Sequence, residues 1–454
     1  MAELKSIGPE AGELKRQLSW LDAAAIFVGI IIGSGIFVAP AEVAAATSSP
    51  WIASLLWLAG AAVALCGAFC YAECGARLPK TGGFYVFYRE VYGPGTAFVA
   101  GFSALVVTYP ASLAAIALIF AHYLGEILPG VLVTDLDTAL AGALALVLAA
   151  LFNIVGVKVG ANVQRLLTTI KVLALLALCV AAVVAPAAAP AEVTGPALPL
   201  LPSGLLGLVG AMVILLWTYD GWSDVTLIGG ELKDPSRDFG RAVGFGVLVL
   251  AVTYVGVQLA TLSLLGPTAA GASKQVVADA VSAGLGIGMG RAVALLVVIS
   301  TFGSLNGIVL AASRLAFAMS RDGAFVSWFG AVHQRFGTPA RSTGALIAAS
   351  LAYVFVSDFR DLMGFFSFNV WLFYGATAVA LFILRQKKTG EPLSWQAPFG
   401  PLPPLVVILT ALAMTGGLLW QSPERSLIGL AMLVAAAPVY VVWRHYRGTA
   451  RGLS

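Results

Sequence analysis

Charged residues are scarce in this chain of 454 residues: Asp, Glu, Lys and Arg together make up 11% of it, whereas hydrophobic residues make up 59% and the mean hydropathy is +0.93. A soluble protein of this length would divide into about three domains. Domains of that size could not bury so much apolar surface. The composition therefore excludes a soluble globular protein and predicts a membrane protein whose solvent is the bilayer.

Cysteine and histidine are rare as well, with four and three copies. Cys66, Cys70 and Cys74 recur on one face of a predicted helix, which suits a metal site, but no histidine or carboxylate completes a tetrahedral set, so we interpret them as small packing residues. The sequence has no Gly-Lys-Ser/Thr loop for a nucleotide and no basic run for a nucleic acid. It also lacks the nucleophile or metal set of an enzyme and the charged ring of a channel. We therefore predict no enzyme activity, no metal and no cofactor.

Long hydrophobic runs, in contrast, are abundant. Twelve segments approach the roughly 20 residues that a helix needs to cross a bilayer. We predict an all-α polytopic membrane protein with transmembrane helices at residues 21–49, 51–75, 96–124, 138–156, 163–185, 204–229, 241–266, 289–319, 342–357, 361–384, 402–419 and 427–443.

The distribution of basic residues agrees with this count. The first 20 residues are polar and charged and contain no cleavable signal, which predicts a cytoplasmic N-terminus. With that end inside, 21 of the 26 Lys and Arg residues fall in inner segments. The outer segments contain only Lys274, Arg291, Arg360 and Arg425. Twelve spans with both termini in the cytoplasm therefore satisfy the positive-inside rule.

Two of the predicted spans are interrupted. The first contains GIIIGSGIF at residues 29–37, and the sixth contains WTYDGWSD at residues 217–224. Glycine inside a helix costs about 1 kcal/mol relative to alanine, although Gly33 and Gly35 alone are also compatible with close helix packing. Interruptions at corresponding positions of two five-helix halves instead indicate the binding site of a transporter. We therefore predict that both helices are unwound within the membrane.

A helix broken inside the membrane exposes backbone groups that must line a cavity or be bound. The half-helix that starts near Ser34 and Gly35 presents free N–H groups and a positive dipole end, which suit a carboxylate. The half-helices that end near Ile31 and near residues 217–219 present free carbonyls, which suit an ammonium group. A glycine such as Gly33 lets the backbone approach the ligand closely. This arrangement of donors and acceptors predicts an α-amino acid as the substrate.

Side chains near the two interruptions are candidates for the same pocket. Asp220 is compatible with three roles: contact with the substrate, transfer of a proton, or capping of the half-helix that follows it. Trp217 and Tyr219 fall in the middle of their span, so we expect them to line the pocket rather than to contact lipid headgroups. Tyr109, which together with Pro110 interrupts the third span, is expected to face the pocket as well.

Lys171 lies inside a predicted transmembrane helix, where a charge needs a partner or a cavity. One interpretation is that its side chain extends to the inner interface near Arg165. The other is that its ammonium group braces the first and eighth spans, with hydrogen bonds accepted by Ser304 together with Ser300 or Thr301. These hydroxyl residues are also compatible with ordinary hydrogen bonding between helices.

Five motifs occur in the order in which a known family has them. They are IIGSGIF at 31–37, PKTGGFYVFYREVYG at 79–93, TTIKVLAL at 168–175, YDGWSDVTLIGGELKDPSRDFGRAV at 219–243 and FGSLNGIVLAASRLAFAMSRDG at 302–323. Through these motifs the chain resembles the amino acid–polyamine–organocation (APC) superfamily from about residue 14 to residue 445. Within it, the chain resembles the L-type amino acid transporter (LAT) family, and in particular bacterial members such as the serine/threonine exchanger.

The resemblance implies a LeuT-like fold of two inverted five-helix repeats that works by alternating access. It implies that Ser34 and Gly35 bind the substrate carboxylate. The carbonyls of Ile31, Trp217 and Asp220 would bind the amino group of the substrate. Trp217 stands where the family has an aromatic gate over the substrate.

Lys171 matches a lysine that takes the place of a sodium ion in relatives, and the resemblance therefore implies Na⁺-independent transport. The chain departs from the animal members at two points. Many eukaryotic relatives have a small residue at the position of Asp220, where bacterial members often have aspartate. The loop at 125–138 lacks the cysteine through which animal members bind a glycoprotein subunit, so we expect no disulfide-linked partner.

The predicted organisation is a cytoplasmic N-terminal segment at 1–20, a transporter core at 21–385 with repeats at 21–187 and 203–385, two additional helices at 386–445 and a cytoplasmic tail at 446–454. We expect the protein in the inner (plasma) membrane of a bacterium. The predicted function is Na⁺-independent exchange of small or large neutral L-amino acids. A proton-coupled symporter, with the proton on Asp220 or Lys171, is the alternative, and an amino acid sensor without transport activity is a third possibility.

Overall fold

The structure is a computed structural model that describes residues 14–184, 204–286, 289–356, 359–391, 393 and 395–451. Within these ranges the regular secondary structure is helical apart from an isolated β-bridge between Leu18 and Leu232, which confirms the all-α class. Most of the predicted N-terminal segment, the repeat boundaries at 187 and 203 and the end of the predicted tail lie outside the described residues.

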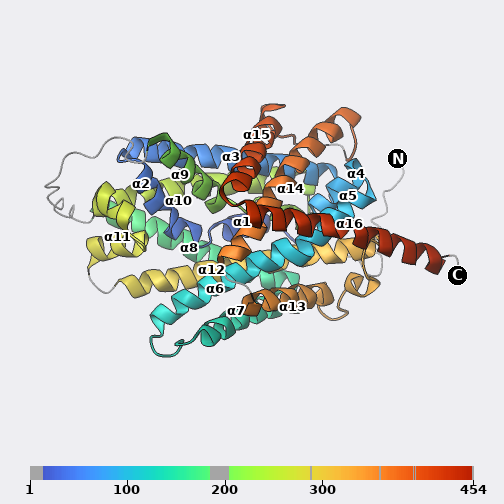
Figure 1. Cartoon of the computed structure of the whole chain (residues 1–454), viewed down its shortest axis with the longest axis horizontal. Helices are drawn as coiled ribbons and strands as arrows, with labels where there is room; N and C mark the ends of the chain where they lie inside the picture. Colours follow the sequence, from blue (N-terminus) through green and yellow to red (C-terminus); the bar gives the residue numbers. More distant parts are fainter. Residues whose placement is uncertain are drawn as a thin grey trace, which may run out of the picture.

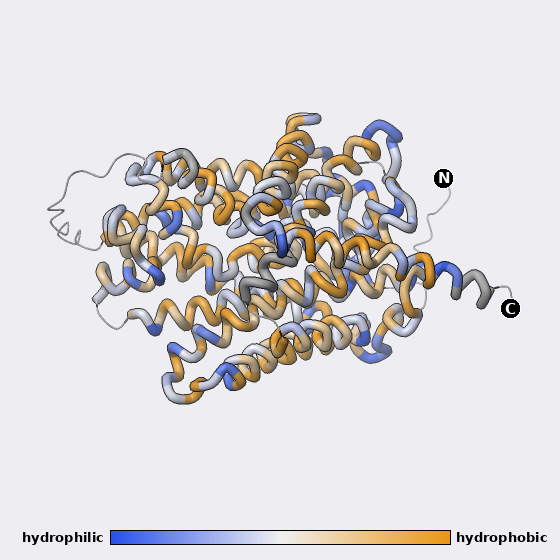
Figure 2. Tube along the Cα trace, in the orientation of Figure 1, coloured by the Kyte–Doolittle hydropathy of each residue, from blue (hydrophilic) through white to orange (hydrophobic). Residues whose placement is uncertain are grey.

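Nine helices of the described chain are long and apolar enough to cross a membrane. They are α3 (Pro50–Arg77), α5 to α6 (Pro94–Ile127), α7 (Asp135–Val155), α8 (Val157–Val184), α10 (Pro235–Ala272), α12 (Gly290–Arg321), α14 (Phe359–Lys387), α15 (Leu402–Gln421) and α16 (Pro423–Arg451). Shorter apolar helices are α1 (Trp20–Ile31), α9 (Gly204–Thr218) and α13 (Ala340–Val356). Hydrophobic residues cover most of the length of these helices, whereas hydrophilic residues gather mainly toward the helix ends (Figure 2). The chain is therefore a multi-pass membrane protein.

Short elements complete the fold. They are η1 (Gly35–Phe37), α2 (Ala39–Ala46), α4 (Phe84–Val91), the π-helical segment η2 (Ala104–Thr108) between α5 (Pro94–Ser103) and α6 (Tyr109–Ile127), η3 (Asp224–Glu231), α11 (Val276–Leu285) and η4 (Ser327–Gly330). Helices α4 and α11 lie between predicted spans and were not predicted. Each has ten residues or fewer, which is too short for a search based on membrane-spanning length.

Helix α1 lies near the centre of the bundle, where it packs against α8, α10 and α12 (Figure 1). Burial falls from this centre outward: 78% of the most apolar stretch of α12 is buried, against 17% of that of α16. The buried face of α12 is rich in Gly, Ala and Ser, which let neighbouring helices approach closely. The small residues of α12 therefore place its backbone next to the end of α1.

The start of α1 is tied to the end of η3 by backbone hydrogen bonds. The amides of Gln17 and Leu18 both donate to the carbonyl of Glu231 at 2.9 Å, and the amide of Lys233 donates to the carbonyl of Leu18 at 2.9 Å. The carboxylate of Glu231 forms a buried ion pair with Arg314 on α12 at 2.7 Å. These contacts join three elements that lie far apart in the sequence.

Candidate substrate site

The first interrupted helix leaves a row of free amides. Helix α1 ends at Ile31, and helical structure resumes only with η1, which continues into α2. The amide of Gly33 turns back to the carbonyl of Ile31 at 2.8 Å. The amides of Ser34, Gly35 and Ile36 donate to no backbone carbonyl within the described residues. Free amides at the start of a helix attract an anionic group.

Lys171 on α8 binds carbonyl groups at the other side of this break, where α1 ends. Its side chain is fully buried, and Nζ donates to the carbonyls of Gly29 and Ile32 at 2.7 Å each and to that of Ser300 at 2.9 Å. An ammonium group has three donors, and these three carbonyls use all of them. Lys171 thus turns toward α1 and α12, whereas Arg165 pairs with a carboxylate in the first turn of α1 at 3.1 Å.

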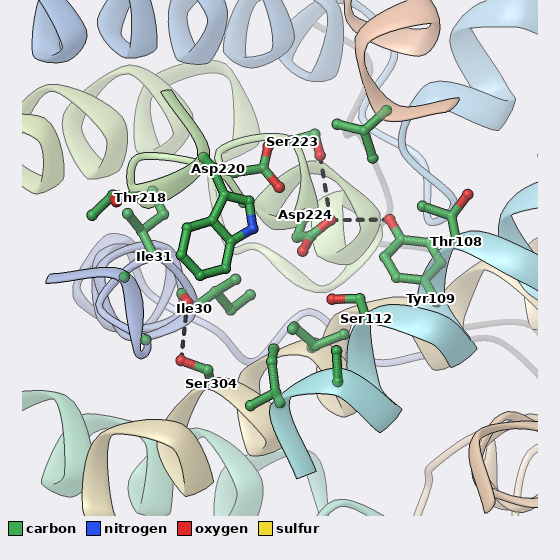
Figure 3. A pocket seen from close by; sticks show the side chains of 18 of the residues that line it. Ile30, Ile31, Thr108, Tyr109, Ser112, Thr218, Asp220, Ser223, Asp224 and Ser304 are labelled. Carbon is green, nitrogen blue, oxygen red and sulfur yellow. Dashed lines mark hydrogen bonds between the residues drawn. The ribbon is translucent and has the colours of Figure 1, made fainter. Parts of the chain in front are cut away.

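The hydroxyl groups of α12 also bind the end of α1, but not in the way we expected. We predicted that Ser304, together with Ser300 or Thr301, accepts from Lys171. Instead, Lys171 donates to the main-chain carbonyl of Ser300, and the Ser300 and Ser304 hydroxyls are donors themselves. Ser304 Oγ donates to the carbonyl of Ile30 at 3.0 Å (Figure 3). The difference arises because the carbonyl oxygens at the end of α1 lack helical N–H partners and are better hydrogen-bond acceptors than the hydroxyl oxygen of a neighbouring serine.

The second interruption lies directly against the first. Helix α9 ends at Thr218 and η3 begins at residue 224. Between them, Gly221 has a φ of +111°, a conformation that favours glycine. A Cβ atom on Gly221 would lie 2.7 Å from Cγ2 of Ile30, and one on Gly35 would lie 3.1 Å from Cα of Thr218. Glycine at both positions therefore lets the two broken helices touch.

Tyr254 on α10 connects the two breaks. Its hydroxyl lies 3.1 Å from the carbonyl of Ile31 and 3.4 Å from the carbonyl of Thr218, which are the last residues of α1 and α9. Tyr219 lies beside it, fully buried, with its ring 4.9 Å from that of Tyr254. Tyr219, which we expected in the pocket, packs against the rings of Trp57 and Tyr254 and is not part of the cavity lining.

A cavity of about 100 Å³ lies between the two breaks. Its lining contains eight of the predicted site residues: Ile31, Gly33, Ser34, Gly35, Tyr109, Trp217, Asp220 and Ser304. Lys171 and Ser300 lie behind it, at the end of α1. Among the described lining residues two are carboxylates, Asp220 and Asp224, and none is Lys, Arg or His.

A second cavity, of about 540 Å³, adjoins the first and shares Ser34, Trp217 and Asp220 with it. It extends toward His122 and Tyr123 near the end of α6. Trp217 therefore stands at the boundary between the small cavity and a larger opening.

Asp220 faces the small cavity and is held by a tyrosine from another part of the chain. Its Oδ1 atom accepts from the hydroxyl of Tyr374 on α14 at 2.5 Å. The capping role considered for Asp220 does not apply, because Ser223 precedes η3 and no side chain caps that helix. Contact with a ligand and proton transfer remain as its possible roles.

Sequence reasoning missed several residues of this cavity: Thr108, Ser112, Ser223, Asp224 and Tyr374. Asp224 ends the polar WTYDGWSD segment, so its charge within a membrane span was an available signal. Tyr374 had no local signal, because it lies in a long apolar span and reaches Asp220 only through the fold.

Comparison with known proteins adds independent information. The amino acid permease family profile matches residues 18–442. The human "Large neutral amino acids transporter small subunit 2" is 30% identical over 450 residues, which cover 96% of this chain and 84% of the relative. The "Serine/threonine exchanger SteT" of Bacillus subtilis is 28% identical over 434 residues, covering 95% and 97%. The "b(0,+)-type amino acid transporter 1" of Rattus norvegicus is 28% identical over 449 residues, covering 97% and 91%.

These matches span nearly the whole chain and confirm the resemblance found from the motifs. The relatives are membrane transporters, and the cavity between two interrupted helices is compatible with that activity. The chain belongs to the amino acid permease family and is an amino acid transporter, not an enzyme.

Proposed function

We propose that the protein is a Na⁺-independent exchanger of small neutral L-amino acids that works by alternating access. One observation carries the proposal: residues of the first break with free amides and two carboxylates of the second break line one small cavity. An α-amino acid has the complementary charges at the same short separation. Among relatives, one is named an exchanger of serine and threonine and another a transporter of large neutral amino acids.

In the proposed complex, the substrate carboxylate accepts hydrogen bonds from the amides of Ser34 and Gly35. The ammonium group of the substrate donates to the carbonyls of Ile31 and Trp217 and to Asp220. A small amino acid fits the cavity of about 100 Å³ alone, whereas a large side chain would have to extend past Trp217 into the adjoining cavity of about 540 Å³. Trp217, at the boundary of the two cavities, covers the substrate on the side of the larger opening.

The position of Lys171 supports independence from sodium. Its ammonium group supplies one positive charge among three carbonyl oxygens of α1 and α12. Oxygen ligands of this kind also suit a metal cation. We infer that the lysine supplies permanently the charge that a sodium ion would supply in a coupled transporter.

The proposed architecture has twelve transmembrane helices in two inverted five-helix repeats, followed by two additional helices. The segment from α1 to α2 forms the first span and the segment from α9 to η3 forms the sixth. Both are interrupted at corresponding positions, which is typical of inverted-repeat transporters. The excess of Lys and Arg in the inner segments supports cytoplasmic termini in a bacterial inner membrane. We propose that the protein works without a disulfide-linked glycoprotein subunit.

Proton-coupled symport is a second candidate, because the cavity contains two carboxylates and no basic side chain in its described lining. A carboxylate that faces the substrate can carry a proton across the membrane. Exchange and symport differ in their need for amino acid on the far side, so one experiment distinguishes them.

The experiment measures uptake of radiolabelled L-alanine, L-serine and L-leucine into proteoliposomes in sodium-free buffer. We expect uptake that requires unlabelled amino acid inside the vesicles and does not change when sodium is added. Uptake into empty vesicles that follows an inward proton gradient would instead establish symport. Absence of uptake under both conditions, from protein that unfolds cooperatively on heating, would contradict the proposal and favour a sensor.

A further inference from the structure

Asp224 is a second carboxylate in the proposed substrate cavity, one turn beyond Asp220. Its side chain is only 7% exposed and lines the cavity. Its Oδ1 atom accepts from the hydroxyl of Tyr109 at 3.0 Å and from that of Ser223 at 3.3 Å (Figure 3). Both hydrogen bonds are accepted by Oδ1, and none of the described side chains donates to Oδ2. Asp224 is thus positioned by its neighbours but retains a free acceptor.

Thr108 provides an independent sign of a ligand at this end of the cavity. It is 3% exposed, lines the cavity next to Tyr109, and its hydroxyl has no hydrogen-bond partner within the described chain. Buried hydroxyl groups are normally paired. An unpaired hydroxyl and a half-satisfied carboxylate, on either side of Tyr109 in the lining of one cavity, indicate that polar groups of a ligand belong in this cavity (Figure 3).

The backbone around Thr108 is also irregular. Residues Ala104–Thr108 form a π-helical segment, an irregularity that is frequent at functional sites. Pro110 has no N–H group to donate to the carbonyl of Val106 four residues earlier. That carbonyl accepts from the hydroxyl of Tyr353 on α13 at 3.1 Å instead. The proline therefore helps to place Thr108 and Tyr109 at the cavity, and α13 supports the irregular turn.

The balance of charges in the cavity supports the same inference. In the proposed complex, the amides near Ser34 neutralise the substrate carboxylate, and Asp220 with nearby carbonyls neutralises its ammonium group. Asp224 then remains without a cation, since the described lining has none. A buried carboxylate without sufficient donors is unfavourable. A donor on the side chain of the substrate would remove this deficit.

We propose that Asp224, positioned by Tyr109, determines specificity by binding a hydrogen-bond donor on the side chain of the transported amino acid. For a neutral substrate the donor is a hydroxyl group, and a side-chain ammonium group, which would extend the substrates beyond neutral amino acids, is the alternative that the test distinguishes. The inference rests on the proposed function, because it assumes that the substrate occupies this cavity. Sites built to bind a substrate hydroxyl reject the analogue without it by factors that reach about 10⁴.

The test compares three amino acids with the same number of non-hydrogen atoms: L-serine, L-2,3-diaminopropionate and L-2-aminobutyrate. Each competes with labelled L-alanine for exchange in proteoliposomes, and the readout is the ratio of the concentrations that halve exchange. For the natural chain we expect at least one of the two donor compounds to compete about tenfold better than L-2-aminobutyrate. The better donor shows whether the site selects a hydroxyl or an ammonium group.

The variant Asp224→Asn should reduce this preference to about threefold or less, because the charge that strengthens the hydrogen bond is lost. The variant Tyr109→Phe should reduce it as well, since Oδ1 is no longer held in place. The matched control is Asp135→Asn, at an exposed position at the start of α7, which should leave the ratio unchanged. A purely structural role of Asp224 would alter all three compounds equally and not their ratio.

Equal competition by all three compounds in the natural chain would overturn the inference, as would an unchanged preference in Asp224→Asn. If Asp224→Asn does not fold, the inference is tested by the ratio of half-inhibitory concentrations in the natural chain and by its reduction in Tyr109→Phe. Failure of the proposed function is distinguishable, because then labelled L-alanine itself would not exchange. Robust alanine exchange without any preference for donors would refute only the role of Asp224.

Discussion

The two interrupted helices differ in what they leave free at the cavity. At the first break, Lys171 and the hydroxyls of Ser300 and Ser304 pair with the carbonyls at the end of α1, whereas the amides of Ser34, Gly35 and Ile36 donate to no backbone carbonyl of the described chain. At the second break, two carboxylates face the cavity, each held by a tyrosine hydroxyl on one oxygen. The first break thus presents mainly donors, with the carbonyl of Ile31 as its one proposed acceptor, and the second break presents mainly acceptors.

This division corresponds to the chemistry of amino acids. Backbone amides suit the carboxylate that all amino acids share, and they do not depend on side chains at the break. Carboxylates on flexible side chains suit the ammonium group and the variable part of the substrate. We therefore expect substitutions that disturb the first break to affect all substrates alike. Substitutions at the second break should affect substrates in different degrees.

The largest effect is expected from Lys171→Met, which keeps an unbranched side chain only one atom shorter and removes its charge. Three buried carbonyls then lose their charged donor, although the hydroxyls of Ser300 and Ser304 still donate to those of Ile32 and Gly29. A hydrogen bond to a charged group contributes about 1.5–3 kcal/mol. Exchange of every substrate should fall at least about 100-fold. The measurement is the initial rate of exchange per folded protein, with Lys158→Met at an exposed position of α8 as the control. A loss of less than about threefold would show that the first break is stable without the ammonium group.

A smaller and more selective effect is expected from Asp220→Asn. Hydrogen bonds to charged groups contribute about 1.5–3 kcal/mol, so the apparent affinity for L-alanine should fall about tenfold or more. Tyr374→Phe is the matched variant, because it removes the contact of Asp220 with α14 and keeps the carboxylate. Its effect should be smaller. An unchanged affinity in Asp220→Asn would mean that carbonyls alone bind the ammonium group, and the contrast between the two breaks would be weaker.

Tyr254→Phe tests the connection between the breaks. The loss of one hydrogen bond to the carbonyl of Ile31, worth about 1 kcal/mol, should slow exchange about fivefold for all substrates. Tyr219→Phe is a closely matched control, since the hydroxyl of Tyr219 is buried and has no partner within the described residues. That variant should exchange normally and unfold at an equal or higher temperature. Equal losses in both variants would indicate that aromatic packing, not the hydroxyl of Tyr254, joins the breaks.

The smallest effect is expected from Ser34→Ala. The amide of Ser34 is the proposed ligand of the substrate carboxylate, and alanine retains it. The apparent affinity should change by about twofold or less, which is the usual range for a substitution that removes no buried interaction. Competition assays with L-alanine measure this change. A tenfold loss would assign the substrate contact to the hydroxyl and would make the first break dependent on side chains after all.

Much of this site was predictable because its elements leave local marks in the sequence. A glycine cluster identified the first interruption and a polar segment around Gly221 identified the second, since glycine and polar residues are unfavourable in an ordinary apolar span. Lys171 was conspicuous because a charge within the membrane requires partners. Hydropathy placed some spans to within a few residues: the predicted 51–75 corresponds to α3 at Pro50–Arg77, whereas the predicted 241–266 is six residues short of α10 (Pro235–Ala272) at each end.

The remainder depends on distances between segments that a single sequence does not contain. Tyr374 and Tyr254 are ordinary tyrosines of apolar spans, and only the fold brings their hydroxyls to the breaks. The orientation of Tyr219, away from the cavity, follows from its packing with Trp57 on α3. The direction of the hydrogen bonds of Ser304 depends on how closely α12 approaches α1. Such pairings follow from packing geometry and not from composition or periodicity.

The hydrogen bonds between the start of α1 and the end of η3 have a consequence for how this region tolerates mutation. The partners of Gln17 and Leu18 are bound through peptide groups, so the connection does not depend on which side chains these residues carry. Exchanging one side chain for another leaves every one of these bonds possible. Proline at either position removes an amide and with it a bond. Gln17, whose side chain is partly exposed, can therefore vary widely, whereas Leu18 is 1% exposed in the core and needs an apolar side chain, and proline is unfavourable at both positions.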